Sequence, residues 1–154
     1  MKLVIIAEAT GIHLKDKLVE YMKAEGYDYV DATQGEMDYI SAGALMGELI
    51  SSAKYDLGVI MCGSGMGVNL VANRYEGVYC GLCESVHTAK MARTITNCNV
   101  LALGGNIVAY DLACKMLKAF VETDFLEGFD SETAANLKSM YEDMKLCDNK
   151  AHHM

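Results

Sequence analysis

Short apolar runs alternate with stretches of helically spaced apolar residues along nearly the whole chain. The runs predict strands over residues 2–7, 28–32, 55–61, 77–83 and 100–103. The helical spacing predicts helices over residues 12–26, 39–52, 65–74, 85–94 and 108–122, and a last helix over 131–147 with Ser131 as its N-cap. This alternation is typical of a parallel sheet covered on both faces. We therefore expect an α/β fold, a three-layer Rossmann-like sandwich of about five parallel strands with a C-terminal helix.

The carboxyl ends of the predicted strands should form one edge of the sheet. Open parallel sheets bind ligands outside this edge. Glu8, Cys62 and Glu84 stand where three of the apolar runs end, and Gly104 and Gly105 follow another. The predicted site therefore lies where these residues meet.

The segment 62–67, Cys-Gly-Ser-Gly-Met-Gly, is the most informative part of this edge. A strand that turns directly into a helix brings several backbone N–H groups, and the positive end of the helix dipole, to one point. A thiol at such a point favours its thiolate form. The segment thus predicts a base or nucleophile, Cys62, beside donors for a developing oxyanion.

Two familiar glycine loops fit this segment poorly. A dinucleotide-binding loop needs a glycine where Val68 stands, and a phosphate-binding P-loop needs a lysine that the segment does not contain. A third interpretation stays open, in which the glycines only permit a tight turn and Cys62 is an inert core residue.

Composition narrows the class of protein. With 154 residues, 52% of them hydrophobic and 22% charged, the chain fits one packed domain over 1–154, whose tail is the helical segment 125–154. The net charge of −8 argues against nucleic acid as a partner. No apolar run is long enough for a membrane span or a signal peptide, so we expect a cytoplasmic protein without a membrane partner.

Six cysteines raise the question of redox or zinc chemistry. Cys80 and Cys83 have the spacing of a redox pair, but on a strand their side chains point to opposite faces. We therefore expect Cys80, Cys83, Cys98 and Cys114 to be buried and reduced.

The segment 62–67 does not stand alone. Together with Asn73, with Asp38-Tyr39 and with the later Asn-Val-Leu-Ala-Leu-Gly of 99–104, it resembles the type B ribose-5-phosphate isomerases. Their superfamily includes the two subunits of galactose-6-phosphate isomerase. The resemblance covers about residues 1–125 in strand order, turn positions and spacing.

The resemblance implies an isomerase that interconverts aldose and ketose forms of a pentose or hexose phosphate through an enediol. Cys62 would be the base and Ser64 would hydrogen-bond a substrate oxygen. The substrate-binding set would include Glu8, Tyr39 and the backbone N–H groups of Gly63, Gly65, Met66 and Gly67. The reaction would need no cofactor and no metal.

Several positions depart from the family pattern. Ala9 replaces a histidine of the first loop, Ile95 replaces the histidine that opens the sugar ring, and Asn106 replaces a phosphate-binding arginine. Arg93 and Asn97 complete the predicted substrate-binding set, and His87 is the nearest candidate for the missing ring-opening group. The departures resemble those of the B subunit of galactose-6-phosphate isomerase.

Three functional hypotheses follow. The first is an isomerase acting as a homodimer or higher homo-oligomer. The second is a subunit that needs a homologous partner chain, or a non-catalytic protein that binds sugar phosphates. The third and weakest is a flavodoxin-like receiver or FMN protein on a similar sheet.

Overall fold

The structure, a computed structural model, describes the backbone of residues 1–152 and the side chains of residues 1–148. Its centre is a five-stranded sheet in the order β2-β1-β3-β5-β4, in which every neighbouring pair is parallel. The three inner strands are buried along their whole length, because helices cover both faces. The strands are β1 Leu3–Ala7, β2 Tyr29–Asp31, β3 Leu57–Cys62, β4 Cys80–Leu82 and β5 Val100–Gly104.

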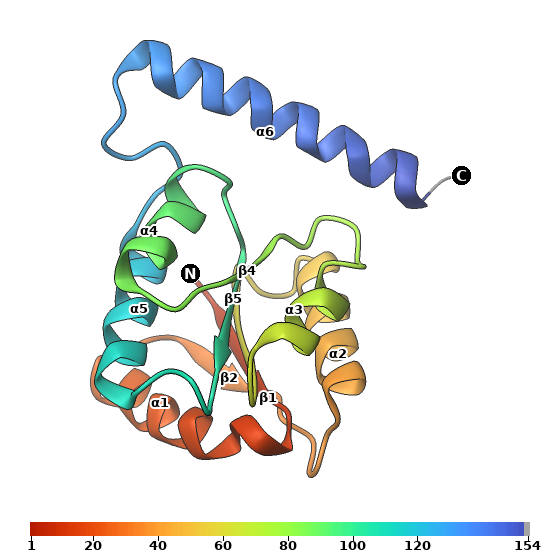
Figure 1. The fold of residues 1–154 in the computed structure, drawn as a ribbon, viewed down its shortest axis with the longest axis vertical. Coiled ribbons are helices and arrows are strands. Elements are labelled where there is room, and N and C mark those ends of the chain that lie inside the picture. The colour runs from red at the N-terminus through yellow and green to blue at the C-terminus, as the bar shows by residue number, and fades with distance from the viewer. Residues whose placement is uncertain (153–154) are drawn as a thin grey trace.

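Helices form the two outer layers (Figure 1). One face is covered by α1 Ile12–Ala24, α4 Val86–Thr94 and α5 Tyr110–Glu122, and the other by α2 Tyr39–Ser51 and α3 Met66–Ala72. A short 3₁₀ turn, η1 Ala9–Gly11, joins β1 to α1. The sheet has five parallel strands with helices on both faces, so the predicted fold class is confirmed.

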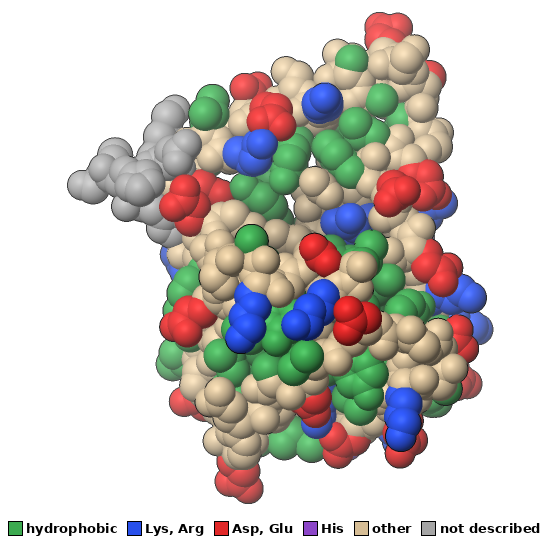
Figure 2. Space-filling model, turned by 180° about the vertical axis from the view of Figure 1, so that it is seen from behind, with side chains coloured by type: hydrophobic (Ala, Val, Ile, Leu, Met, Phe, Trp, Pro, Cys, Tyr) green, Lys and Arg blue, Asp and Glu red, His purple; other side chains and the backbone are tan. Residues whose placement is uncertain are grey.

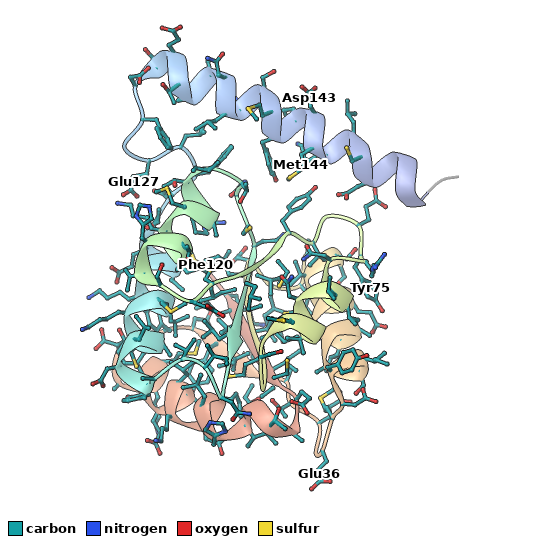
Figure 3. All side chains as sticks on the ribbon, viewed as in Figure 1. Glu36, Tyr75, Phe120, Glu127, Asp143 and Met144 are labelled. Carbon is teal, nitrogen blue, oxygen red and sulfur yellow. The ribbon has the colours of Figure 1, made fainter. Side chains whose placement is uncertain are left out.

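Alternating side chains on each strand serve two separate cores. The side chain of Phe120, from α5, lies fully buried in the core shared with α1 and α4 (Figure 3). Cys83 belongs to this core, whereas Cys80 belongs to the core under α2 and α3. The prediction that these two cysteines face opposite sides is confirmed. Cys98 and Cys114 are also buried, and all six cysteines are unpaired.

Among the strands, the largest boundary difference concerns β4, which spans only three residues where the sequence predicts seven. Gly77 adopts a left-handed backbone (φ 74°), and the Tyr79 N–H donates to the side-chain oxygen of Asn99 at 2.8 Å. The segment before Cys80 is therefore a turn tied to a side chain rather than a paired strand.

The last helix, α6 Ser131–His152, lies across the amino edge of the sheet, opposite the carboxyl ends of the strands (Figure 1). Its Tyr141 ring packs 5.8 Å from the ring of Tyr79 and 5.0 Å from that of Phe125, measured between centroids. Asp148 accepts a hydrogen bond of 2.8 Å from the Tyr79 hydroxyl. Met144 points from α6 toward the domain (Figure 3). Residues 153–154 of the predicted tail lie outside the described residues.

The helix begins differently from the prediction. Ser131 is its first helical residue and not its N-cap. Asp130 caps it instead, because its carboxylate accepts the N–H groups of Glu132 at 3.1 Å and Thr133 at 2.9 Å. The pKa of Asp130 lies below its ordinary value. The largest cause is the hydrogen bond from the Thr133 N–H, followed by the bond from the Thr133 hydroxyl.

The helices and the surface charges bear on the expected absence of membrane and nucleic-acid partners. Among the described residues, no helix is both long and apolar enough to cross a lipid bilayer. Seen from behind, acidic and basic side chains are interspersed over the described part of the surface (Figure 2). The absence of a nucleic-acid partner stays a prediction.

Candidate active site

Cys62 is the last residue of β3, one position later than the predicted end of that strand. It lies beside Gly104 of β5, and its carbonyl accepts the N–H of Gly105 at 2.7 Å. Its side chain is 6% exposed. It lines a pocket of about 340 Å³ at the carboxyl edge, together with Glu8, Thr10, Tyr39, Gly63, Ser64 and Gly67. Cys62 therefore belongs to the core under α2 and α3 and also lines a cavity, as a base that meets a ligand must.

The backbone after Cys62 presents fewer free donors than the sequence predicts. The Gly65 N–H donates to the Cys62 sulfur at 3.1 Å, and the Met66 N–H donates to the Ser64 hydroxyl oxygen at 3.3 Å. The N–H of Gly67 lies in the first turn of α3, where no carbonyl of the same helix can accept it. Gly63, Ser64 and Gly67 are thus the loop residues placed to meet a ligand.

Gly65 has a structural role instead. Its backbone is left-handed (φ 78°), and a β-carbon there would lie 2.8 Å from the Leu103 carbonyl carbon and 3.0 Å from the Gly104 nitrogen. Gly65 thus faces β4 and β5 and not the pocket, and the Met66 side chain is exposed to solvent. Of the predicted loop residues, Gly65 and Met66 are absent from the described pocket lining.

Glu8 and Thr10 form one wall of the pocket. The Glu8 N–H donates to the Met61 carbonyl at 2.9 Å, which extends the pairing of β1 with β3. A carboxylate oxygen of Glu8 accepts the Thr10 N–H at 3.0 Å and the Thr10 hydroxyl at 2.5 Å. The sequence predicts Glu8 at this edge but not Thr10, whose only signal is its place two residues after the strand-end carboxylate.

Tyr39 also lines the pocket, beside Gly67. It is the first residue of α2 and is 49% exposed. A β-carbon on Gly67 would lie 2.7 Å from the Tyr39 ring, so the ring stands directly over the loop. Asp38 fixes this start of the helix, because its carboxylate accepts the Ser41 N–H at 2.7 Å and the Ser41 hydroxyl at 2.8 Å.

The cap on α2 should respond to acid. The pKa of Asp38 lies below its ordinary value, mainly because its carboxylate accepts the Ser41 N–H and, to a smaller extent, the Ser41 hydroxyl. Its stabilisation is therefore complete above the ordinary pKa and is lost as the pH falls through the lowered one. We expect the Ser41 amide to lose protection from hydrogen exchange, relative to its intrinsic rate, as the pH falls below the ordinary pKa of an aspartate. Asp38→Asn, which caps without titrating, should keep its protection. Equal loss in both proteins would contradict this assignment.

Arg93 and Asn97 are not brought to this pocket. They line a separate cavity of about 480 Å³ at the amino edge, with Met1, Asp56 and Tyr141 among its other residues. The Arg93 guanidinium donates to the carbonyl of Cys98 at 2.6 Å and to the side-chain oxygen of Asn97 at 3.1 Å. Within one chain, therefore, both residues stabilise the turn before β5.

His87, and Ile95 at the position of the missing ring-opening histidine, also lie apart from Cys62. Ile95 lines a cavity beside α4 with Cys83 and Cys98 among its neighbours. His87 is in the first turn of α4, after the edge strand β4. Two strand spacings separate β4 from β3, or about 10 Å. Among the residues whose side chains are described, no group of three His, Cys, Asp or Glu could hold a metal ion.

The chain matches a known protein family over most of its length. The family model described as Ribose/Galactose Isomerase covers residues 3–137 of the chain. The chain belongs to this family. The prediction of this superfamily, and of an isomerase as the class of enzyme, is thereby confirmed.

Three individual members show how this chain relates to the family. It is 34% identical to a 4-deoxy-4-sulfo-D-erythrose isomerase from a Clostridium species, over 84% of each chain. It is 33% identical to the galactose-6-phosphate isomerase subunit LacB of Clostridium acetobutylicum, over 73% of this chain and 66% of that one. The structure of ribose-5-phosphate isomerase B from Clostridium thermocellum matches with a TM-score of 0.82 and 28% identity, over 94% of this chain and 98% of that one.

Proposed function

We propose that the protein interconverts the aldose and ketose forms of a sugar with an anionic end, with Cys62 as the base. The observation that carries the proposal is the position of Cys62, which lines the pocket where β3 ends in the 62–67 loop. Isomerisation needs one group that takes a proton from carbon and returns it to the neighbouring carbon. It also needs donors for the oxyanion that forms between these steps.

The pocket residues can share these tasks in a balanced sequence. The Cys62 thiolate takes the proton from C2 of an open-chain aldose, and the C2–H electron pair forms the C1–C2 double bond while the carbonyl electrons move to O1. Ser64 and the N–H groups of Gly63 and Gly67 would hydrogen-bond the enediolate oxygens. The O2 hydrogen then moves to O1, and Cys62 returns its proton to C1. The product is the ketose, and no electron leaves the substrate.

The proposed substrate is a sugar whose number of carbons spans a range. The resemblance implies pentose or hexose phosphates, whereas the Clostridium relative is named for a four-carbon sulfonate. Phosphate and sulfonate are both tetrahedral anionic groups at the end of a sugar. The proposed substrate class is therefore a sugar of four to six carbons with such a group at its far end.

The surface beside the pocket favours an assembly. Four large apolar side chains on α2, on α3 and in the turn after β5 are exposed in the single chain, namely Ile40, Met66, Leu70 and Ile107. Large apolar side chains that are left in solvent on elements around a pocket favour an interaction site there. We propose a homodimer or higher oligomer. The alternative is pairing with a homologous chain, which the similarity to a LacB subunit supports.

A panel assay separates these possibilities. The purified protein is incubated with erythrose 4-phosphate, ribose 5-phosphate, allose 6-phosphate and galactose 6-phosphate, and conversion is followed by NMR. We expect one of these aldoses to be converted to its ketose by the protein alone. Turnover that appears only after a co-encoded homologue is added would favour the paired-subunit alternative. No turnover in either arm would contradict the isomerase proposal.

A further inference from the structure

Two polar side chains flank the floor of the Cys62 pocket. A β-carbon on Gly63 would lie 2.9 Å from the Thr10 hydroxyl oxygen and 3.1 Å from the Asn106 amide nitrogen. Thr10 comes from the turn after β1 and Asn106 from the turn after β5. The Asn106 backbone N–H donates to the Gly63 carbonyl at 2.9 Å, which fixes that turn against the loop. A hydroxyl and an amide thus meet on either side of Gly63.

His13 adjoins this pair from the first turn of α1. Its Nε2 lies 2.9 Å from the carbonyl oxygen of Gly105, the residue before Asn106. A β-carbon on Gly105 would lie 3.3 Å from the His13 ring and 3.2 Å from the Thr10 carbonyl oxygen. Because a carbonyl can only accept, Nε2 must carry the hydrogen of this bond. Nδ1 is then left to bind a ligand or a second proton, and no described residue hydrogen-bonds it.

The charges around the pocket make His13 distinctive. The turns at the carboxyl edge, residues 8–11, 33–38, 62–65, 83–85 and 105–109, contain carboxylates but no lysine or arginine. The nearby Lys15 is held by Asp31 at 2.6 Å and by Asp16 at 2.7 Å. An imidazole ring can carry a positive charge, and a bound anion favours that charged form. Among the residues whose side chains are described, His13 thus adjoins the Gly63 floor and can provide a positive charge.

We propose that His13, together with Thr10 and Asn106, binds the anionic group at the end of the sugar remote from Cys62. His13 supplies the charge, while Thr10 and Asn106 supply neutral donors. The inference rests on the proposed function, since it assigns the far end of the same substrate. It makes His13 a specificity-determining residue, which strengthens binding of the charged sugar but takes no part in the proton transfer.

Kinetics of three variants at one fixed pH test this assignment, with the anionic sugar that the panel identifies. His13→Gln keeps a donor for the Gly105 carbonyl but removes the charge. It should raise KM about 10- to 100-fold and leave kcat within about twofold, the effect of losing one charge-assisted hydrogen bond. His13→Lys should restore most of the affinity. Lys23→Gln, which removes an exposed positive charge from the last turn of the same helix, should behave as wild type.

The outcomes separate this inference from the proposed function. An unchanged KM in His13→Gln, a loss confined to kcat, or an equal effect of Lys23→Gln would overturn the role of His13 while the isomerase proposal stands. A readout without turnover is the NMR signal of the His13 ring during titration with inorganic phosphate, assigned by its absence in His13→Gln. We expect this signal to shift while that of His87 stays. A stationary His13 signal would overturn the inference even if the protein proves not to be an isomerase.

Discussion

Cys62→Ser should lower kcat about 1,000-fold and leave the fold unchanged. Serine fits the space of the thiol, and its hydroxyl oxygen can still accept the Gly65 N–H that the sulfur accepts at 3.1 Å. A serine hydroxyl does not ionise near neutral pH, so the group that removes the proton is lost. Steady-state kinetics with the best sugar of the panel measure the effect, and circular dichroism checks the fold.

A matched control separates loss of the base from loss of any buried thiol. Cys114 is also buried, but it lies on α5 in the core of the opposite layer. Cys114→Ala should retain wild-type kcat even if its melting temperature falls. A Cys62→Ser enzyme with more than about a tenth of wild-type kcat would contradict the assignment of Cys62 as the base.

Gly65→Ala should destabilise the protein by about 3 kcal/mol and abolish activity. A left-handed backbone costs an alanine about 1–2 kcal/mol. The added β-carbon would also press against the backbone of Leu103 and Gly104, which adds about 1–3 kcal/mol. Because Gly65 donates to the Cys62 sulfur, any shift of the loop displaces the base as well. Denaturant unfolding and the sugar assay measure the two effects.

Gly26 provides the control for this substitution. Its backbone has nearly the same angle (φ 75°), but no atom lies within 4 Å of its β-carbon position. Gly26→Ala should therefore cost only about 1–2 kcal/mol and retain activity. Equal destabilisation by the two substitutions would show that the contact of Gly65 with β5 carries no energy.

The fold could be predicted largely because each strand leaves a local signal. Apolar runs as short as that of β1 are bounded by polar turns, and the order of strands and helices follows directly. β4 is the exception, because the hydrogen bond between Tyr79 and the Asn99 side chain replaces a strand ladder there. The course of α6 is a second exception. It depends on the contacts of Tyr141 with Tyr79 and Phe125, which no local sequence pattern contains.

The site could be predicted where it follows from topology. Cys62, Glu8 and Ser64 lie at strand ends, and the structure brings them together. Arg93 lies in the last turn of α4 and Asn97 follows it before β5, a position that places both at the amino edge. The sequence therefore held the signal that they lie apart from Cys62 within one chain.

The residues that sequence reasoning missed depend on close backbone contacts. His13 has the spacing of an exposed helix residue, and the structure indeed leaves it exposed. Its relation to the pocket depends on the Gly105 carbonyl, 92 positions away in the chain. Thr10 likewise gains its place from the approach of Gly63. Contacts of this kind arise only when three strand ends are assembled.

Hydrogen exchange at carbon tests the central claim most directly. The best sugar of the panel is isomerised in deuterium oxide, and the product is examined by NMR and mass spectrometry. If the Cys62 thiol carries the proton between C2 and C1, deuterium from solvent enters at these carbons with the wild-type enzyme and not with Cys62→Ser. Deuterium incorporation by Cys62→Ser at the wild-type rate would contradict the account.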